Sequence, residues 1–540
     1  MPNGAQAMVT ALEAEGVRTL FGYPGAAICP FLDALAASDI TYHLVRHEQS
    51  AGHAASGYAR VSGSPGVCFA TSGPGATNLI TALATAYMDS IPLVAITGQV
   101  QSGLIGRDVF QEADITGAAE PFCKHSYLVR DANDLPRVMK EAFYIARSGR
   151  PGPVLVDVPS DIQEQPVTSP AHHEKVDIRG YKPRTKGHAL QIKRVAERVA
   201  RAQKPVICAG GGIFSAHAQA VLAAFAEKCR IPVVNTLMGI GALPAAHPLA
   251  FGMLGTHGRA VANHALHNCD LLIIAGGRVG DRSVAEPDQI AARTCVVHID
   301  VDPAEIGKNM DAELPLVGDL RLVLEALTEQ TVPGDTAAWV ASLESLRDAP
   351  EPARPPHSGC IEPRAFFRTL AAQMEDDAVV VADVGQSQIW AANHLAMRHG
   401  RFLTTGGMGT MGYSLPAAVG AAVALPERQI VAVCGDGAFH MSMMELATIR
   451  QYRLDIKLVV MHNDCLGMVH ELQTKHYGGR YVATSLGCGD PDFQLLAKAY
   501  GLESRRVEND ADVPDAVARM LHAPGPYLLE CRIDPDEPTL

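Results

Sequence analysis

The stretch VAVCGDGAFHMSMMELATIRQYRLDIKLVVMHND, residues 431–464, decides the fold. An apolar run ends at the triplet GDG of residues 435–437, a helical pattern follows, and a second apolar run ends at Asn463. This order predicts a strand, a glycine turn, a helix and a second, parallel strand. In open α/β sheets the carboxyl ends of the strands form the edge where ligands bind. We therefore expect Asp436 and Asn463 to lie side by side at that edge.

These residue types suit a metal-bridged diphosphate. One carboxylate and one amide oxygen are ligands that Mg²⁺ accepts while it keeps positions open for phosphate oxygens. Gly437 lets the backbone approach a phosphate, and the following helix offers free N–H groups and the positive end of its dipole. The alternative is a plain strand-to-helix turn with an acidic residue at the helix start. The asparagine directly after the next strand favours the metal site.

Length and composition set the limits of the molecule. A chain of 540 residues predicts about three domains of ~150–200 residues each. The net charge of −13 and the lack of a dense Lys/Arg run argue against nucleic acid or an anionic membrane as a partner. No apolar stretch reaches the ~18 residues that span a bilayer, and the first residues do not resemble a leader peptide. We expect a cytoplasmic enzyme whose 12 scattered cysteines are reduced.

Alternating apolar strands and helical patterns predict an α/β fold with three doubly wound parallel-sheet domains, at residues 1–165, 188–330 and 360–540. Strands in the first are TLFGYPG, ITYHLV, GVCFATSGPG, LVAITGQ and GPVLVDVP. The last domain repeats the rhythm of the first. Polar segments without periodicity, at about 164–187 and 328–359, are interpreted as linkers.

The middle domain carries glycine turns and polar loops at its strand ends. Its first strand ends in the glycine run 210–212, and the loops TLMG, GTHG, GGRVGDR and IDVDPAEIGKN follow comparable strands. The glycine run is not GxGxxG, so an ordinary NAD site is poorly supported. Any one loop is explained by simple turn chemistry, but together they predict a cradle for a large phosphate-bearing ligand.

Many further motifs have the same order as in one known family. FGYPGAA, RHEQSAGHAASGYAR, TSGPGATNLITALATAYMDSIPLVAITGQV, FQEADI, KHSYLV, SGRPGPVLVDVPSDIQ, TLMGIG, LGTHG, DVGQSQIW and GGMGTMGYSLPAA, with GDG and its asparagine, cover nearly the whole chain. The chain resembles the catalytic subunit of acetohydroxyacid synthase (acetolactate synthase), a thiamine-diphosphate (ThDP) enzyme family. The resemblance implies an N-terminal pyrimidine-binding domain, a central FAD-binding domain and a C-terminal diphosphate- and Mg²⁺-binding domain.

The resemblance also implies the activity and the partners. Pyruvate, a small 2-oxo acid, is decarboxylated, and its two-carbon unit joins a second 2-oxo acid to give 2-acetolactate, as in branched-chain amino-acid biosynthesis. The active sites lie between subunits of a homodimer or homotetramer, and a separate regulatory subunit is common in the family. Three alternatives stay open: a ThDP carboligase or decarboxylase of another 2-oxo acid in specialised metabolism, a flavin enzyme of the pyruvate oxidase type, and a non-catalytic paralogue.

Four positions match catalytic residues of the family. Glu48 matches the glutamate that hydrogen-bonds the pyrimidine ring of ThDP from the neighbouring subunit; on local grounds alone it is a solvated charge at a helix start. Arg282 matches the cation for the acceptor carboxylate. Gln111 and Lys124, together with Phe110, match residues that line the entrance and the active site. On local grounds alone, Lys124 is a solvated lysine and Phe110 a core phenylalanine.

The resemblance assigns three sets of binding residues. For Mg²⁺ they are Asp436, Asn463 and the backbone carbonyl of Cys465. Cofactor-binding positions in the first and last domains are Gly25, Gln386, Gly409, Met411, Gly435, Gly437 and Ala438. Those in the middle domain, for an FAD of structural role, are Gly210, Gly211, Gly212, Thr236, Leu237, Met238, His257, Gly258, Arg278, Glu305 and Ile306.

The chain departs from the family pattern at several of its loops. RVGDR at residues 278–282 replaces the usual RFDDR, and Leu472 replaces a tryptophan that favours 2-oxobutyrate as the acceptor. Thr256, Ser387 and Ala26 replace a methionine, a histidine and a glycine. These departures predict a changed acceptor, either pyruvate alone or a different aldehyde or oxo acid.

Overall fold

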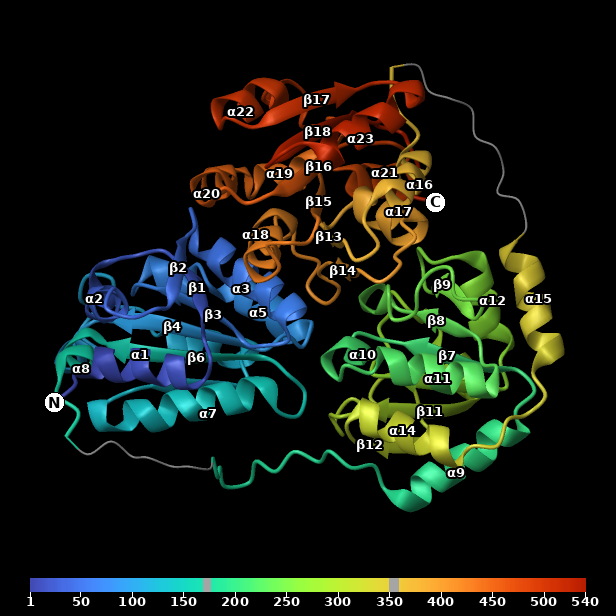
Figure 1. Cartoon of the computed structure of the whole chain (residues 1–540), viewed down its shortest axis with the longest axis horizontal. Helices are drawn as coiled ribbons and strands as arrows, with labels where there is room; N and C mark the ends of the chain where they lie inside the picture. Colours follow the sequence, from blue (N-terminus) through green and yellow to red (C-terminus); the bar gives the residue numbers. More distant parts are fainter. Residues whose placement is uncertain (169–175, 349–358) are drawn as a thin grey trace.

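Three α/β units make up the computed structural model of the chain, which describes residues 1–168, 176–348 and 359–540. Each unit is a six-stranded parallel sheet covered by helices (Figure 1), so the predicted doubly wound fold is confirmed. Residues 169–175 and 349–358, which belong to the two predicted linkers, lie outside the described residues. Within the described residues, every helix is too short or too polar to cross a bilayer.

The first sheet has the strand order β2-β1-β3-β4-β6-β5. Its strands are β1 (Thr19–Gly22), β2 (Thr41–Leu44), β3 (Gly66–Ala70), β4 (Leu93–Gln99), β5 (His125–Leu128) and β6 (Pro153–Pro159). Its helices are α1 (Gly4–Ala14), α2 (Cys29–Leu35), α3 (Glu48–Ser62), α4 (Pro74–Thr77), α5 (Ile80–Met88), α6 (Ile115–Ala119), α7 (Leu135–Arg147) and α8 (Ser160–Glu164). The inner strands β3, β4 and β6 are apolar because helices bury both of their faces. The half-exposed edge strand β5 is an addition to the five predicted strands.

The middle sheet has the order β12-β11-β10-β7-β8-β9. Its strands are β7 (Pro205–Ala209), β8 (Val233–Asn235), β9 (Ala250–Met253), β10 (Leu271–Ala275), β11 (Cys295–Asp300) and β12 (Leu314–Val317). Its helices are α9 (Ala189–Arg201), α10 (Gly212–Ser215), α11 (Gln219–Cys229), α12 (Ala260–Asn268), α13 (Pro287–Ala291) and α14 (Leu320–Gln330). The chain starts at β7, moves out to β9 and returns to the other side at β10. This order is that of dinucleotide-binding folds, with the switch point between β7 and β10.

Helix α15 (Ala337–Arg347) corrects the interpretation of residues 328–359 as a linker. It runs along the outside of the middle domain, beside α12 (Figure 1). Its buried face carries Trp339, Val340 and Leu343, and the indole N–H of Trp339 donates to the backbone oxygen of Pro205 at 3.2 Å. These three apolar residues lie on one face of the helix, and their burial packs the helix onto the middle domain, although the sequence around it is proline-rich.

The last sheet has the order β14-β13-β15-β16-β18-β17, which repeats the first sheet strand for strand. Its strands are β13 (Val379–Ala382), β14 (Arg401–Leu403), β15 (Ile430–Gly435), β16 (Ile456–His462), β17 (Glu503–Val507) and β18 (Tyr527–Arg532). Its helices are α16 (Pro363–Gln373), α17 (Gln386–His394), α18 (Ser414–Ala424), α19 (Asp436–His440), α20 (Leu446–Tyr452), α21 (Gly467–Tyr477), α22 (Phe493–Ala499) and α23 (Val513–His522). β15 and β16 are parallel neighbours, as predicted, and two short helices connect them.

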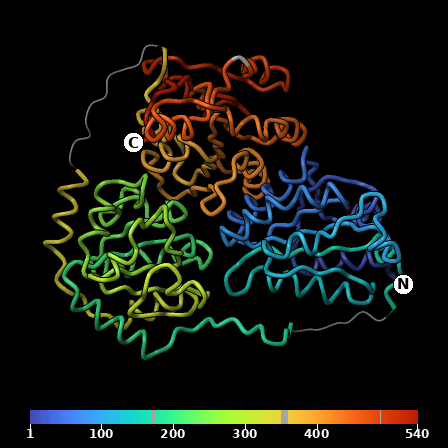
Figure 2. Tube along the Cα trace, turned by 180° about the vertical axis from the view of Figure 1, so that it is seen from behind, coloured from blue at the N-terminus to red at the C-terminus, as the bar shows by residue number. Residues whose placement is uncertain are grey.

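The first and last domains meet through helices α3 and α18. A side chain on Gly57 would collide with the backbone of Ala417, and one on Gly420 would collide with the backbone oxygen of Ala54. The two backbones therefore touch without intervening side chains. Seen from behind (Figure 2), these domains lie against each other, while residues 176–188 run along the outer edge toward the middle domain.

We expect the substitution Gly420→Val to destabilise the protein by about 3 kcal/mol or more, because the new side chain overlaps fixed backbone of α3. The melting temperature of the purified chain measures this loss. Gly103→Val is the matched control, since a Cβ there meets no atom within 4 Å. Equal melting temperatures for the two variants would contradict the close contact between the helices.

Candidate functional site

The ends of β15 and β16 bring Asp436 and Asn463 together. One carboxylate oxygen of Asp436 accepts the backbone N–H groups of Asn463 at 3.0 Å and of Asp464 at 2.8 Å. The other accepts the backbone N–H of Gly437 at 2.8 Å. Asp436 and Asn463 are both buried. The structure thus places one carboxylate and one amide side chain at two adjoining strand ends, together called the turn of Asp436 and Asn463, at the carboxyl edge of the sheet.

The third predicted metal ligand lies in the same turn. Asn463 Oδ1 accepts the backbone N–H of Cys465 at 3.3 Å, and an isolated β-bridge pairs Cys465 with Ser485. Asp464, between them, has a left-handed backbone with φ of 57°. Aspartate tolerates this conformation better than most residues do. The backbone carbonyl of Cys465 is therefore carried by a turn that hydrogen bonds fix on both sides.

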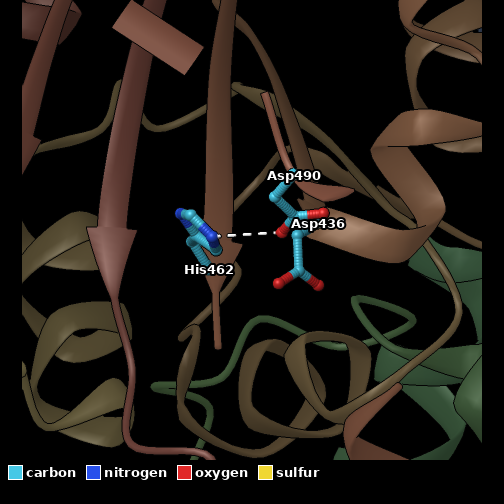
Figure 3. A group of neighbouring side chains, drawn as sticks. All are labelled: Asp436, His462 and Asp490. Atoms are coloured by element: carbon cyan, nitrogen blue, oxygen red, sulfur yellow. Dashed lines mark ion pairs between the residues drawn. The ribbon is translucent and has the colours of Figure 1, made fainter. Parts of the chain in front are cut away.

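A group of ionisable side chains lies behind this turn. Figure 3 shows Asp436, His462 and Asp490, with His462 Nε2 and Asp490 Oδ2 3.2 Å apart. Burial raises the pKa of Asp436, and the negative charge of Asp490 acts in the same direction. Burial alone would lower the pKa of His462, but its hydrogen bond to Glu530 and the charges of nearby carboxylates outweigh burial and raise it.

The start of α17 joins the turn through Gln386. Asn463 Nδ2 donates to Gln386 Oε1 at 3.3 Å, and Gln386 Nε2 donates to the backbone oxygen of Glu537 at 2.8 Å. Gln386 follows β13 and Asp436 follows β15, so they flank the switch point of the last sheet. Gly467 has no side chain where Gln386 approaches it. The structure thus brings Gln386, Asp436 and Asn463 into one cluster.

The other predicted residues of this domain surround the start of α19. A Cβ on Gly437 would lie 2.6 Å from Leu466 Cδ2 and 3.7 Å from the terminal methyl of Met411. Gly409 has a positive φ of 64°, which glycine adopts at little cost. Gly435 closes β15 and Ala438 is buried in α19. A bare backbone therefore faces Met411 at the helix start.

In the first domain Glu48 and Gln111 both lie against the turn that follows β3. Glu48 begins α3, and its Oε2 accepts the side-chain amide of Asn78 at 2.9 Å. A Cβ on Gly75 would lie 3.3 Å from Glu48 Oε1, and one on Gly73 would lie 2.9 Å from Gln111. The strand end that carries Gly25 packs against the same turn, because Ala27 N donates to Thr71 Oγ1 at 3.3 Å.

The structure does not add Lys124 to this group. Its ammonium donates to the backbone oxygens of Ile145 and of Ser148, the latter at 2.7 Å, and to the Tyr181 hydroxyl at 3.0 Å. Burial lowers the pKa of Lys124 to about 8. In this chain Lys124 ties the carboxyl end of α7 to the segment that leads into the middle domain.

The predicted cradle residues of the middle domain converge at its switch point. A side chain on Gly210 would collide with the backbone oxygen of Gly276, and Gly212 N donates to that oxygen at 2.8 Å. A Cβ on Gly211 would lie 3.3 Å from Met238 Cβ. Thr236, Leu237 and Met238 follow β8. Glycine turns without side chains therefore line the place where β7 and β10 diverge.

Further predicted cradle residues lie on the surrounding loops. Burial lowers the pKa of His257, and its backbone oxygen accepts Asn393 Nδ2 at 2.8 Å. Gly258 N donates to Gly255 O at 2.9 Å, and Ile306 is half-buried. The positive charge of Arg278 acts on the buried carboxylate of Asp89 in the first domain.

Arg150 has a structural role that no motif in the sequence marks. Its guanidinium pairs with Glu305 at 2.7 Å and with Asp302 at 3.6 Å, and its Nε donates to Ser90 Oγ at 2.8 Å. Burial would raise the pKa of Glu305, but Lys308 and Arg150 outweigh burial and lower it. Arg150 lies in a Gly-Pro turn, and the only local signal was a cation without a nearby acidic residue in the sequence.

The residues predicted to act on the acceptor, and Phe110 at the predicted entrance, are open to solvent in the single chain. The side chain of Arg282 is 80% exposed, while Phe110 is 87% and Leu472 49% exposed. The backbone of Arg282 is held, because its oxygen accepts Thr256 N at 2.9 Å. These three residues therefore project from fixed loops and from α21 into space that this chain leaves open.

Comparisons with known proteins agree with this architecture. Residues 2–118 match the family model of the thiamine pyrophosphate enzyme N-terminal TPP binding domain, and residues 192–327 match that of the central domain. Residues 383–531 match the C-terminal TPP binding domain of the same enzymes. The middle match contains the glycine cradle, and the last match contains the turn of Asp436 and Asn463.

Several curated proteins match along nearly the whole chain. The large subunit of acetolactate synthase isozyme 2 from Escherichia coli K12 is 45% identical, over 98% of this chain and 96% of its own length. A probable acetolactate synthase large subunit from Methanocaldococcus jannaschii is 43% identical, over 99% and 92%. An acetolactate synthase from Arthrospira platensis is 44% identical, over 99% and 94%. The chain belongs to the thiamine pyrophosphate enzymes, in the family of acetolactate synthase large subunits.

Proposed function

We propose that this enzyme decarboxylates pyruvate and transfers the two-carbon unit to a second pyruvate, giving 2-acetolactate and CO₂. The buried turn of Asp436 and Asn463 at neighbouring strand ends carries the proposal, in a chain 45% identical to an acetolactate synthase large subunit. A flavin enzyme of the pyruvate oxidase type, or a ThDP enzyme for another 2-oxo acid, remains the alternative. The whole-length similarity to acetolactate synthases supports the synthase.

The residues of the turn fit a Mg²⁺-bound diphosphate. Asp436, Asn463 and the backbone carbonyl of Cys465 offer three oxygens of the hard type that Mg²⁺ prefers. The start of α19, where Gly437 carries no side chain, and the amide of Gln386 would hold the phosphate oxygens. When bound, ThDP supplies the electron sink for decarboxylation, and the chain supplies position and charge.

Glu48 would act at the other end of the cofactor. Its carboxylate stands at the start of α3, already fixed by Asn78, and can hold a proton on a ring nitrogen of the pyrimidine. We place this ring on a partner subunit, in a homodimer or homotetramer with active sites between subunits. The large exposure of Phe110 and Arg282 supports this arrangement, since both would be covered there. Arg282 would fix the carboxylate of the acceptor.

FAD of structural role belongs to the same proposal. The middle sheet has the strand order of dinucleotide-binding folds, and the glycine turns at residues 210–212 and 276–277 meet at its switch point. Relatives named as large subunits support a separate, smaller regulatory subunit. A cytoplasmic location is supported by the eleven described cysteines, all of which are free thiols.

The direct test is to incubate the purified chain with pyruvate, ThDP and Mg²⁺ and to identify the product. We expect 2-acetolactate with release of CO₂. Consumption of oxygen or of a quinone with pyruvate would instead indicate the oxidase. Failure to bind ThDP in the presence of Mg²⁺ would indicate a non-catalytic paralogue.

Asp436→Asn should separate binding from stability. We expect ThDP affinity in the presence of Mg²⁺ to fall at least about 100-fold. Substituting a group that only hydrogen-bonds a metal ligand costs about 10- to 100-fold in affinity, and loss of the ligand itself should cost more. The raised pKa of Asp436 means that its charge weakens the fold above that pKa, so the apoprotein gains stability from this group as the pH falls. The variant should lose this pH dependence and, at pH 8, melt at or above the temperature of the unaltered chain.

Equilibrium dialysis of ThDP and thermal melting measure both effects. Asp376→Asn is the control, because Asp376 forms an exposed pair with Arg398 at 3.0 Å. A variant that binds ThDP as the unaltered chain does would remove Asp436 from the metal site.

Acceptor choice should depend on residue 472. With pyruvate and 2-oxobutyrate in competition, we expect the unaltered chain to show no strong preference for 2-oxobutyrate, because Leu472 offers less apolar surface than tryptophan. Leu472→Trp should shift the product ratio toward 2-oxobutyrate by about ten-fold, the scale of a filled apolar pocket. Val469→Trp, also half-exposed and one turn away on α21, is the control. A strong 2-oxobutyrate preference of the unaltered chain would contradict the proposed change of acceptor.

A further inference from the structure

We propose that the chain holds a second divalent cation, of the first-row transition series, between His462, Asp490 and Asp436. One ligand atom from each of these residues lies within 4.8 Å of the other two. They come from the end of β16, the loop before α22 and the start of α19 (Figure 3). This site shares Asp436 with the proposed Mg²⁺ site and goes beyond the function proposed above.

The separations fit a small tetrahedral cation. His462 Nε2 and Asp490 Oδ2 are 3.2 Å apart. Metal–nitrogen and metal–oxygen bonds of about 2.0–2.2 Å at tetrahedral angles place neighbouring ligand atoms roughly 3.3–3.6 Å apart. Little movement is therefore needed for both atoms to share one ion.

The other nitrogen of His462 is arranged as in known metal centres. Nδ1 and Glu530 Oε1 are 2.8 Å apart, and Gln494 Nε2 donates to the second oxygen of Glu530 at 2.8 Å. Metal-ligating histidines usually give their second N–H to a carboxylate, which fixes the ring and leaves the first nitrogen for the metal. Glu530 can play this part, while Nε2 of His462 faces Asp464 Oδ1 at 3.0 Å and Asp490 Oδ2 at 3.2 Å, so the ion would replace the contact with Asp464.

Within the part of the chain that the structure describes, the carboxylate of Asp490 is buried without a hydrogen bond. Its side chain is only 4% exposed, and neither of its oxygens makes a hydrogen bond within the described residues. His440 Nε2 lies 3.3 Å from Oδ1 and also has no hydrogen bond there. Buried carboxylates without hydrogen bonds are rare, and an ion that both oxygens face explains this one.

The charges of the surroundings leave room for a cation. Arg532 pairs with Asp464 at 2.6 Å, and Arg506 pairs with Glu530 at 3.0 Å. Asp436 and Asp490 have no arginine or lysine partner among the described residues. Nε2 of His462 faces Asp464 and Asp490, and Nδ1 faces Glu530. A divalent ion beside Nε2 would balance the charges of the buried Asp436 and Asp490.

The imidazole separates this ion from the Mg²⁺ of the ThDP site. Imidazole ligands suit Zn²⁺, Co²⁺ and similar ions, whereas Mg²⁺ prefers oxygen atoms alone. Asn463 belongs to the Mg²⁺ set and is absent from this one. The second ion would fasten the loop at 487–490 to the ends of β15 and β16.

The test uses the full chain, freed of metal with a chelator and titrated with Co²⁺ in excess Mg²⁺ without ThDP. We expect a single Co²⁺ per chain, with the visible absorption of a histidine-containing tetrahedral site. Asp490→Asn should weaken this binding roughly 10- to 100-fold. Asn463→Ala should leave it nearly unchanged. His476→Gln, an exposed histidine on α21, controls for surface binding and should also leave it unchanged.

Equal Co²⁺ affinity of the unaltered chain and Asp490→Asn would overturn the site. Loss of the signal in Asn463→Ala would also overturn it, because the Co²⁺ would then occupy the proposed Mg²⁺ position. If Asp490→Asn does not fold, the melting temperature of the unaltered chain tests the site instead. We expect Zn²⁺ in excess Mg²⁺ to raise this temperature. An unmoved melting temperature contradicts the site.

Discussion

The contact between α3 and α18 holds the first and last domains together. Two helices meet backbone to backbone only where glycine leaves out the Cβ, and Gly57 and Gly420 do so from opposite sides. The contact fixes the first domain on the last in one orientation, because any rotation would drive carbonyl oxygens into Cα atoms. Polar ties at its edge, such as Arg46 N to Glu445 Oε1 at 2.9 Å, then close the same interface.

Within each domain the parallel sheet determines which loops lie close together. All six strands end at the same edge, so loops that are far apart in the sequence meet there. The first and last domains share one strand order and place Glu48 and Asp436 at equivalent edges. The middle domain has another order, and its glycine turns meet at a different switch point. The same packing principle therefore produces two kinds of ligand edge in one chain.

Much of this could be predicted from local patterns. A GDG after an apolar run and an asparagine after the next one define neighbouring strand ends, because parallel strands leave few other arrangements. The glycine cradle of the middle domain was likewise visible as turns after strands. The family resemblance added the roles of Glu48 and Arg282, whose local sequence is ordinary.

Other features depend on contacts that no local pattern encodes. Arg150 and Glu305 are 155 positions apart, and their pairing follows only from how two domains meet. His462 and Asp490 come together because a loop folds back over the end of β16. The proline-rich flanks of α15 predict a linker, but the buried side chains of Trp339, Val340 and Leu343 make the segment a packed helix. The ammonium of Lys124 donates to carbonyl oxygens at the end of α7, which come near it only in the folded domain.

The exposure of Arg282, Phe110 and Leu472 has an evolutionary consequence. Side chains that touch little of their own domain can be exchanged at almost no cost in folding free energy. The turn of Asp436 and Asn463 is buried, and most changes there would weaken the fold or the cofactor site. Selection can therefore explore new acceptors through these exposed positions while the cofactor end stays the same. Leu472 and Thr256, two positions where this chain departs from the family pattern, are exposed in this way, whereas the departures at Val279 and Ser387 are buried.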